Sequence, residues 1–389
     1  MAQATYKILV VDDEVDLEPL MLQRMRRDIR SGRYSFVFAH NGLEALEKLN
    51  EDNSIDMVLS DINMPQMDGL TLLEQIPTVD PNIKSVIVSA YGDMTNIRTA
   101  MNRGAFDFVT KPLDFADLRI TIERTLAHLS EWRAALASRD QLVSLQRELD
   151  VASEMQKSIL PTRFPQREDY EVFAHMEPAR NVGGDFYEII ELEGGRLGLC
   201  IADVSDKGVP AALFMMSSRT LLKGASLGCD NPGDVLKEVN DLLRETNESE
   251  MFVTLLYGIY DPATGNFTYA NGGHNEPLHV RPGGSSSLLP RTGGVLLGIV
   301  PGIEFSYNTV NLAPGDTLFL YTDGVTEAFN MQEEEFGLER LLTLFAESPA
   351  TDAQQITMKV FEAVHGFAED TPQSDDITCL TLHRSEPES

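Results

Sequence analysis

Acidic side chains stand directly after two apolar runs near the start of this chain. Asp12 and Asp13 follow residues 8–11, and Asp61 follows residues 57–60. If these runs are parallel strands, their carboxyl ends meet at one edge of a sheet, where ligands bind in folds of this kind. Three carboxylates gathered at that edge could hold one hard cation such as Mg²⁺.

A hydroxyl group and a positive charge end two further strand-like runs. Ser89 closes residues 85–89, and Lys111 follows residues 106–110. With the carboxylates and a cation, they would form a site that accepts a phosphoryl group. A single aspartate at such a position could simply cap a helix. Five chemically matched groups at strand ends favour a site.

A second acidic set lies in the C-terminal half, beside glycines and at the junctions of strands and loops. Its members are Asp185, Asp203, Asp323, Asp375 and Asp376. Because no histidine or cysteine accompanies them at ligand spacing, zinc is disfavoured and Mg²⁺ or Mn²⁺ is favoured. Two such ions about 4 Å apart could activate a shared water for in-line hydrolysis of a phosphate ester. An Asp-Gly pair alone is commonly a turn, so the combination carries the prediction.

The acids of the first set can meet at one edge only if the runs before them are parallel strands, which requires strands that alternate with helices. Between residues 5 and 127, apolar runs alternate with amphipathic stretches, and the strand candidates are residues 7–11, 35–39, 57–60, 85–89 and 106–110. This rhythm predicts an α/β domain with a five-stranded parallel sheet.

The segment 128–164 has a helical pattern. It contains no glycine and no proline before Pro161, and apolar residues recur every three or four positions, with Gln156 as a polar member of the same stripe. The pattern predicts one long helix. Its apolar face could form a coiled coil or pack on its own domain, and both interpretations stay open.

The acids of the second set lie in a strand-rich segment, residues 165–385. Strand candidates are residues 196–202, 252–260, 266–270, 317–321 and 377–382, and a turn at 261–265 predicts a hairpin. Helical patterns at residues 211–225, 231–246 and 353–368 complete an α+β layered domain.

Composition narrows the classes of partner. Sixty-one acidic residues against 31 basic ones give a net charge of −30, which disfavours binding to DNA. There is no apolar run of membrane-spanning length and no signal-peptide pattern, so we expect a cytoplasmic protein without a membrane partner. The 3 cysteines are scattered, which suits reduced thiols better than disulfides.

Residues 5–127 resemble a response-regulator receiver domain, which has a flavodoxin-like fold. The matching motifs are VVDDE at 10–14, DINMPQMDG at 61–69, SA at 89–90 and TKP at 110–112. The resemblance implies a sensor histidine kinase or other phosphodonor, and a cis bond between Lys111 and Pro112. It also implies these roles: Asp61 as phosphoacceptor; Asp12, Asp13, Asp61 and the carbonyl of Asn63 as Mg²⁺ ligands; Ser89, Phe108 and Lys111 as switch residues.

Residues 170–385 resemble the bacterial PP2C-like phosphatases of the SpoIIE/RsbU type, which form a β-sandwich with flanking helices. The matching motifs are RNVGGDFY at 180–187, ADVSDKGVPAAL at 202–213, ANGGHN at 270–275, YTDGVTEA at 321–328 and SDDIT at 374–378. The resemblance implies two Mn²⁺ or Mg²⁺ ions held by Asp185, Asp203, the carbonyl of Val204, Asp323 and Asp375, with Asp376 as second choice.

Three further residues of this segment carry weaker expectations. Asp206 stands where the family usually has a small glycine, which affects the expected shape of the loop. Arg180 could contact substrate phosphate through its guanidinium group or brace the acidic site. His274 could contact a water or substrate, or make a structural hydrogen bond in a glycine-rich turn.

Together these resemblances predict a two-component response regulator in which Asp61 controls a phosphoserine or phosphothreonine phosphatase. Residues 145–161 resemble the helix that pairs subunits in this branch, so we expect a homodimer, and relatives imply a phosphorylated anti-anti-sigma-like substrate. The alternative is a non-enzymatic adaptor of the RssB type that delivers a stress sigma factor for proteolysis. A diguanylate cyclase is disfavoured, because residues 183–186 lack one acid of that motif.

Overall fold

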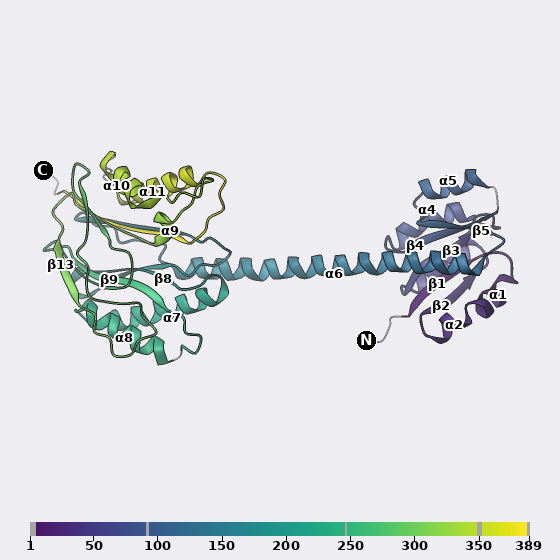
Figure 1. Cartoon of the computed structure of the whole chain (residues 1–389), viewed down its shortest axis with the longest axis horizontal. Helices are drawn as coiled ribbons and strands as arrows, with labels where there is room; N and C mark the ends of the chain where they lie inside the picture. Colours follow the sequence, from purple (N-terminus) through teal and green to yellow (C-terminus); the bar gives the residue numbers. More distant parts are fainter. Residues whose placement is uncertain (1–4, 91–92, 246, 348–351, 387–389) are drawn as a thin grey trace. The chain divides into compact units, whose positions relative to one another are not determined.

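The computed structural model describes residues 5–90, 93–245, 247–347 and 352–386. The chain divides into two compact units, Met1–Ser144 and Leu145–Ser389, and each is described by itself. Figure 1 labels several elements of each unit.

The first unit is an α/β domain built on a five-stranded sheet. The strands are β1 (Tyr6–Val11), β2 (Tyr34–Ala39), β3 (Ile55–Asp61), β4 (Lys84–Ala90) and β5 (Asp107–Lys111). All pair in parallel, in the order β2-β1-β3-β4-β5, which confirms the predicted parallel sheet. The helices are α1 (Leu17–Arg24), α2 (Arg26–Arg30), α3 (Gly42–Glu51), α4 (Gly69–Val79) and α5 (Met94–Asn102).

Helices cover both faces of this sheet, and alternate strand residues supply the two cores. On β1, Ile8 and Val10 pack in one cluster with residues of α1, whereas Leu9 and Val11 pack in a second cluster with residues of α3 and α4. Because both faces are covered, β3 is buried along its whole length. The strand ends at the carboxyl edge are therefore fixed from both sides.

The helix α6 (Phe115–Ile159) begins in the first unit and ends in the second. Leu118, Ile122, Leu126 and Leu129 are buried in the core of the first unit, so the helix starts well before residue 128. Further along, Leu142 and Leu145 are exposed. Neither α6 nor any other helix in the described ranges is apolar enough over sufficient length to cross a bilayer.

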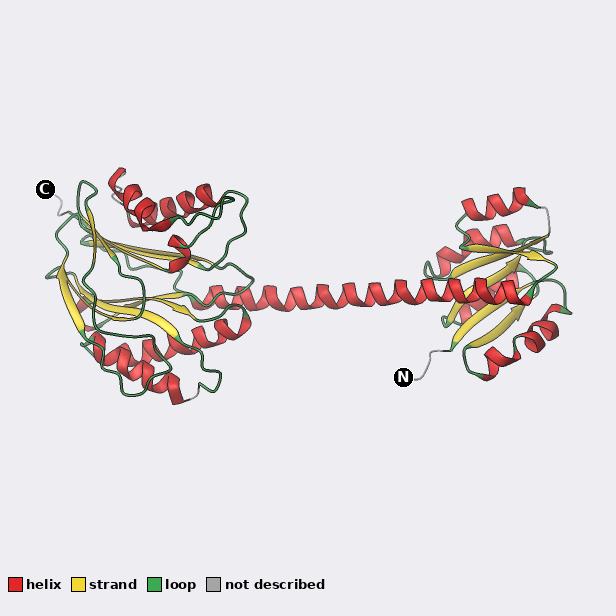
Figure 2. Cartoon of the chain, in the orientation of Figure 1, coloured by secondary structure: helices red, strands yellow, loops and turns green. Residues whose placement is uncertain are grey.

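The second unit consists of two antiparallel sheets with helices on their outer faces (Figure 2). One sheet has the order β13-β10-β9-β8-β7 and the other β12-β11-β14-β15-β6. The strands are β6 (Tyr170–Glu177), β7 (Phe186–Glu191), β8 (Leu197–Val204), β9 (Val253–Asp261), β10 (Asn266–Gly272), β11 (Leu278–Val280), β12 (Ser286–Leu288), β13 (Tyr307–Asn311), β14 (Thr317–Tyr321) and β15 (Ile377–Arg384). The helices are α7 (Val209–Ser226), α8 (Pro232–Glu245), α9 (Asp323–Thr326), α10 (Gly337–Glu347) and α11 (Ala353–Ala368), with a 3₁₀ turn, η1, at Glu193–Gly195. This architecture confirms the predicted α+β sandwich with flanking helices.

Successive side chains of a strand point to opposite faces of its sheet. One set therefore fills the core between the two sheets, and the other set fills the core under the helices. On β14, Leu318 and Leu320 pack in the large cluster shared by both sheets. Phe319 and Tyr321 point the other way and pack with residues of α10 and α11. The predicted turn is also present, because β9 and β10 pair as a hairpin through Asp261 and Asn266.

A buried ion pair joins β7 to α7. Arg219 of α7 lies 2.5 Å from a carboxylate oxygen of Glu188, whose side chain is 1% exposed. Burial raises the pKa of Glu188, although the charge of Arg219 works in the opposite direction. Removing one partner of such a pair leaves an uncompensated buried charge, whereas replacing both partners often costs little.

We therefore expect Arg219→Met to lower the local free energy of unfolding by about 3 kcal/mol. The double substitution of Glu188 and Arg219 by methionine should recover most of this loss. The measurement is urea-dependent hydrogen exchange of peptides from β7 and α7 in the full chain. Equal losses in the single and double variants would show that the pair does not behave as a buried charge pair.

Candidate functional site

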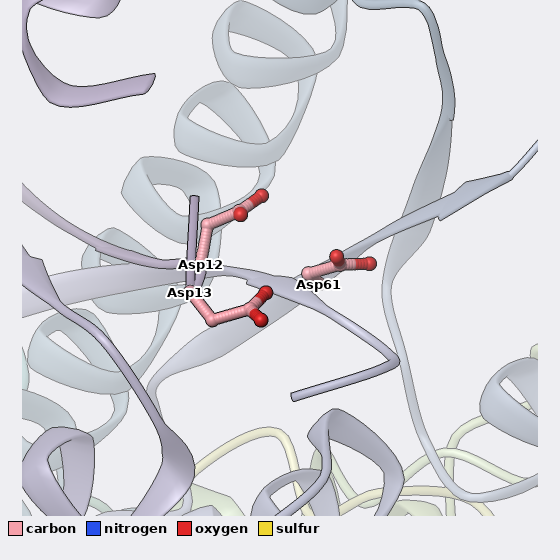
Figure 3. A group of neighbouring side chains, drawn as sticks. All are labelled: Asp12, Asp13 and Asp61. Carbon is pink, nitrogen blue, oxygen red and sulfur yellow. The ribbon is translucent and has the colours of Figure 1, made fainter. Parts of the chain in front are cut away.

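Three aspartates meet at the carboxyl edge of the parallel sheet. Asp12 and Asp13 follow β1, Asp61 is the last residue of β3, and Figure 3 shows the side chains gathered there. One carboxylate oxygen from each can be chosen so that all lie within 4.8 Å of one another. Asp12 and Asp61 are buried, whereas Asp13 is exposed, so a cation at this point would be open to solvent.

Lys111 supplies the positive charge at this edge. Its Nζ lies 2.8 Å from Asp61, 3.0 Å from Asp12 and 3.0 Å from Glu14. Burial opposes the charge, but hydrogen bonds to the three carboxylates outweigh it and raise the pKa of Lys111. The pKa of Asp12 is also raised, because burial outweighs its hydrogen bonds to the Glu14 N–H and Lys111. The lysine is held as a permanent cation beside Asp61.

Ser89 brings its hydroxyl to the same edge. The residue is buried, and its Oγ has no hydrogen-bond partner among the described residues. The registers pair Asp61 with Val88, and Ser89 with Thr110, so Ser89 lies one position beyond Asp61 along the edge.

The remaining predicted residues of the first unit lie around this edge. Asn63 and Phe108 are exposed, and the Phe108 side chain lies on β5. The bond between Lys111 and Pro112 is cis, as the resemblance implies. Gly69 is tightly enclosed, since a Cβ there would stand 1.9 Å from the Asp61 carbonyl oxygen.

In the second unit, Asp185 is the most enclosed of the predicted acids. It directly precedes β7 and is 1% exposed. Its Oδ2 accepts hydrogen bonds from Thr322 at 2.7 Å and from Thr378 at 2.6 Å. Burial, followed by the charges of Asp203 and Asp376, raises the pKa of Asp185 despite these two hydrogen bonds.

Asp203, near the end of β8, faces the same cluster. Burial and then the charges of Asp323 and Asp375 raise the pKa of Asp203 to about 7. Burial and the charge of Asp375 likewise raise the pKa of Asp323, which begins α9. These acids come from both sheets, and they lie close enough that the negative charge of each raises the pKa of its neighbours. Within the described ranges, no three of them have ligand atoms all within 4.8 Å of one another.

The two adjacent aspartates before β15 have different surroundings. Asp376 is buried, and its carboxylate accepts the backbone N–H groups of Ala179 at 2.8 Å, Gly184 at 2.6 Å and Asp185 at 3.3 Å. Asp375 is only partly buried and forms an ion pair with Lys207 at 2.8 Å. Asp376 therefore holds the backbone that carries Asp185, whereas Asp375 presents its carboxylate to the other acids.

Backbone atoms also approach the cluster. A Cβ on Gly184 would stand 2.9 Å from the Val204 carbonyl oxygen, so glycine permits the close approach of these two segments. Asp206 adopts a left-handed conformation with a φ of 69°, and the loop thereby keeps the backbone shape that a glycine would favour.

Arg180 and His274, the two candidates for contact with the substrate, differ in solvent exposure. Arg180 is exposed and makes no hydrogen bond or ion pair with the described residues. His274 is buried, and its Nδ1 lies 2.9 Å from Thr254 Oγ1, which is paired in register with Asp203. Burial lowers the pKa of His274 to about 4, so its ring is neutral near pH 7.

Several residues of this site were not among the predicted ones. Thr322 and Thr378 orient Asp185, and Lys207 pairs with Asp375. All three lie inside the motifs that carry the aspartates. The spacing of residues in the sequence does not show, however, which distant acid a threonine hydroxyl or a lysine ammonium group will contact.

Comparisons with known proteins assign each unit. Residues 8–123 match the family model described as response regulator receiver domain. Residues 193–385 match the model described as Stage II sporulation protein E (SpoIIE). The second range includes Asp203, Asp323 and Asp375 but begins after Asp185.

Individual relatives align with more than half of the chain. Protein IcfG of Synechocystis sp. is 33% identical over 267 residues, which are 61% of this chain and 42% of the relative. Phosphoserine phosphatase RsbU of Bacillus subtilis is 29% identical over 239 residues, which are 61% of this chain and 70% of the relative. The chain thus spans less than half the length of IcfG.

A solved structure supports the fold of the second unit. The SiaA-PP2C domain of Pseudomonas aeruginosa aligns with a TM-score of 0.55 and 23% identity, over 63% of this chain and 98% of that domain. The chain therefore joins a response-regulator receiver domain to a PP2C-like phosphatase domain of the SpoIIE type.

Proposed function

We propose that this protein is a response regulator in which phosphorylation of Asp61 controls a metal-dependent phosphoserine and phosphothreonine phosphatase. The observation that carries the proposal is the acidic cluster of the second unit. Burial and then the charges of Asp323 and Asp375 raise the pKa of Asp203 to about 7, in a domain similar to phosphoserine phosphatase RsbU. Buried acids of this kind are favourable only when cations or protons balance their charge.

The residues of the second unit fit two divalent ions. The donors are carboxylates and one carbonyl, which suit Mn²⁺ or Mg²⁺ rather than zinc. We assign Asp185, Asp203, Asp323, Asp375 and the carbonyl of Val204 as the groups that would hold them. Asp375 is preferred to Asp376, because three backbone N–H groups hold the buried carboxylate of Asp376. The partly buried carboxylate of Asp375 accepts one backbone N–H and pairs with the side chain of Lys207.

When bound, the ions would activate water and neutralise the charge of a phosphate ester undergoing in-line hydrolysis. The chain's own residues would orient the reacting groups. Thr322 and Thr378 fix the carboxylate of Asp185 through two hydrogen bonds. The exposed guanidinium group of Arg180 is available for a substrate phosphate. The neutral ring of His274 supports Thr254 beside Asp203 and is better suited to positioning than to anion binding.

The residues of the first unit fit one Mg²⁺. Asp12, Asp13, Asp61 and the carbonyl of Asn63 would hold it. The close approach of the three carboxylates supports this assignment, as does the buried Ser89 hydroxyl, which lacks a hydrogen-bond partner among the described residues. Lys111 would pair with a phosphoryl group on Asp61, and Ser89 would contact the same group. Phe108 would respond to this contact as the aromatic switch residue.

The partners of the proposed function follow from its chemistry. A sensor histidine kinase or another phosphodonor would act on Asp61, and a phosphorylated anti-anti-sigma-like protein would be the substrate. The exposed leucines of α6, Leu142 and Leu145, support pairing of two copies through this helix. Such a protein would work in the cytoplasm.

The first prediction of the proposed function concerns the aspartates. Asp185→Asn and Asp203→Asn should each reduce manganese-dependent hydrolysis of a phosphoserine protein more than about 100-fold, because even the outer partners of metal ligands contribute 10–100-fold. Asp234→Asn, which changes an exposed acid on α8, is the matched control and should retain activity. If the wild-type protein with manganese hydrolyses neither such a substrate nor p-nitrophenyl phosphate, the chain acts in another way, and the adaptor becomes the working model.

The second prediction concerns pH. The pKa of Asp203 in the metal-free protein is about 7, so the carboxyl group is mostly protonated at pH 6 and mostly charged at pH 8. Manganese must displace this proton, and its apparent affinity should rise with pH by up to about tenfold per unit for each proton released. Isothermal titration calorimetry in two buffers with different ionisation enthalpies counts the protons. Release of no proton at pH 6 would contradict the prediction.

The third prediction concerns the receiver. Acetyl phosphate should label the wild-type protein but not Asp61→Asn, and beryllofluoride should change phosphatase activity only when Asp61 is present. Asp80→Asn is the control, because Asp80 precedes β4 and lies away from the carboxyl edge. Equal activity with and without beryllofluoride in the wild type, over a range of protein concentrations, would contradict control by Asp61.

A further inference from the structure

A buried amide ties the last turn of α6 to one residue of the second unit. Gln156 Nε2 donates to the carbonyl oxygen of Gly183 at 2.6 Å, and Gln156 Oε1 accepts the Gly183 N–H at 3.0 Å. Gln156 is 5% exposed although it lies near the end of a largely exposed helical stretch. Because the amide donates through Nε2 to the Gly183 carbonyl and accepts through Oε1 from the Gly183 N–H, the two hydrogen bonds fix both the position and the orientation of the Gly183 backbone.

The segment that Gly183 begins has no room to move independently. A Cβ on Gly183 would stand 2.4 Å from Asp376 Oδ2, and one on Gly184 would stand 2.9 Å from the Val204 carbonyl oxygen. The backbone N–H groups of Gly184 and Asp185 both donate to Asp376. A shift of Gly183 would therefore be passed on to Asp185, two residues later.

A second contact joins the end of α6 to the other side of Asp185. The hydroxyl of Tyr187 donates to the carbonyl oxygen of Pro161 at 3.1 Å. Asp185 thus lies between two residues, Gly183 and Tyr187, that are both hydrogen-bonded to the segment from Gln156 to Pro161.

The rest of the exposed stretch of α6 offers no similar attachment. Between Arg139 and Ile159, all of which are described, the side-chain hydrogen bonds of the other residues stay within the helix, as that of Gln146 to Asp150 does at 2.9 Å. Met155, beside Gln156, is 65% exposed. The amide of Gln156 is therefore the polar group by which this stretch of helix contacts the acidic cluster.

We propose that Gln156 is a positioning residue for Asp185, so that the acidic cluster binds its cations tightly only while the last turn of α6 is in place. A rotation of this turn would break both hydrogen bonds together, since both go to a single residue. The inference deepens the proposed phosphatase function and rests on it for cation binding and turnover, whereas hydrogen exchange tests the positioning of Asp185 by itself.

The test compares three variants of the full chain. Gln156→Met keeps the side-chain volume and removes both hydrogen bonds, whereas Gln156→Glu keeps an acceptor and removes the donor. Gln146→Ala removes a glutamine of the same helix whose amide bonds only to Asp150, and it serves as the matched control. Circular dichroism confirms that each variant is folded.

We expect Gln156→Met to bind manganese about tenfold more weakly by calorimetry and to exchange backbone hydrogens faster in a peptide covering residues 182–187. Gln156→Glu should show the same direction of change, and Gln146→Ala should match the wild type. With excess manganese, turnover by Gln156→Met should recover, because the defect lies in holding the ligand rather than in the chemistry.

The outcomes separate this inference from the proposed function. Wild-type manganese affinity together with wild-type exchange in Gln156→Met would overturn the positioning role. Weaker binding and faster exchange in a protein that hydrolyses no phosphoprotein would support the positioning role and reject the phosphatase. If Gln156→Met does not fold, Gln156→Glu takes its place, and manganese affinity and hydrogen exchange are measured in the same way.

Discussion

Repulsion between carboxylates is the constraint on which the second unit depends. Asp185 and Asp203 lie close together and largely out of water, and burial together with neighbouring charges raises the pKa of both. Like charges held this close would separate if the chain were free to move. The sandwich prevents this, because the acids stand at the ends of strands whose side chains fill one continuous core between the two sheets. The core thus supports an arrangement that is unfavourable until protons or cations balance its charge.

The two units balance acidic charge in different ways. At the receiver edge, Lys111 is a built-in cation that contacts Asp61 and Asp12 directly. In the second unit, Lys207 reaches only Asp375 at the margin, and Asp185 is held by the neutral hydroxyl groups of Thr322 and Thr378. The receiver edge therefore carries part of its balancing charge in the chain itself. A site held by hydroxyl groups has a much stronger electrostatic demand for added cations.

The sequence predicted the elements with strong periodicity and the acids that follow them. The parallel sheet and α11 agree closely with the patterns, because strands buried on both faces and amphipathic helices have clear signatures. The sequence analysis did not predict five strands of the second unit, β6, β7, β11, β12 and β13. β7 carries two glutamates, the buried Glu188 and the exposed Glu191, among its apolar residues, and β13 is short and largely exposed at a sheet edge. The partners of the acids were also missed, because Thr322 and Thr378 lie 137 and 193 residues from Asp185 and meet it only in the folded chain.

Because α6 is a single helix, the number of residues between the exposed Leu145 and the buried Gln156 sets the angle between that leucine and the amide that contacts Gly183. Each residue inserted between the two would turn Leu145 by about 100° relative to the acidic cluster. An insertion of seven residues would restore the original angle to within about 20°. Any surface formed by this part of the helix would therefore keep its direction relative to Asp185 only when the length changes in steps of seven residues.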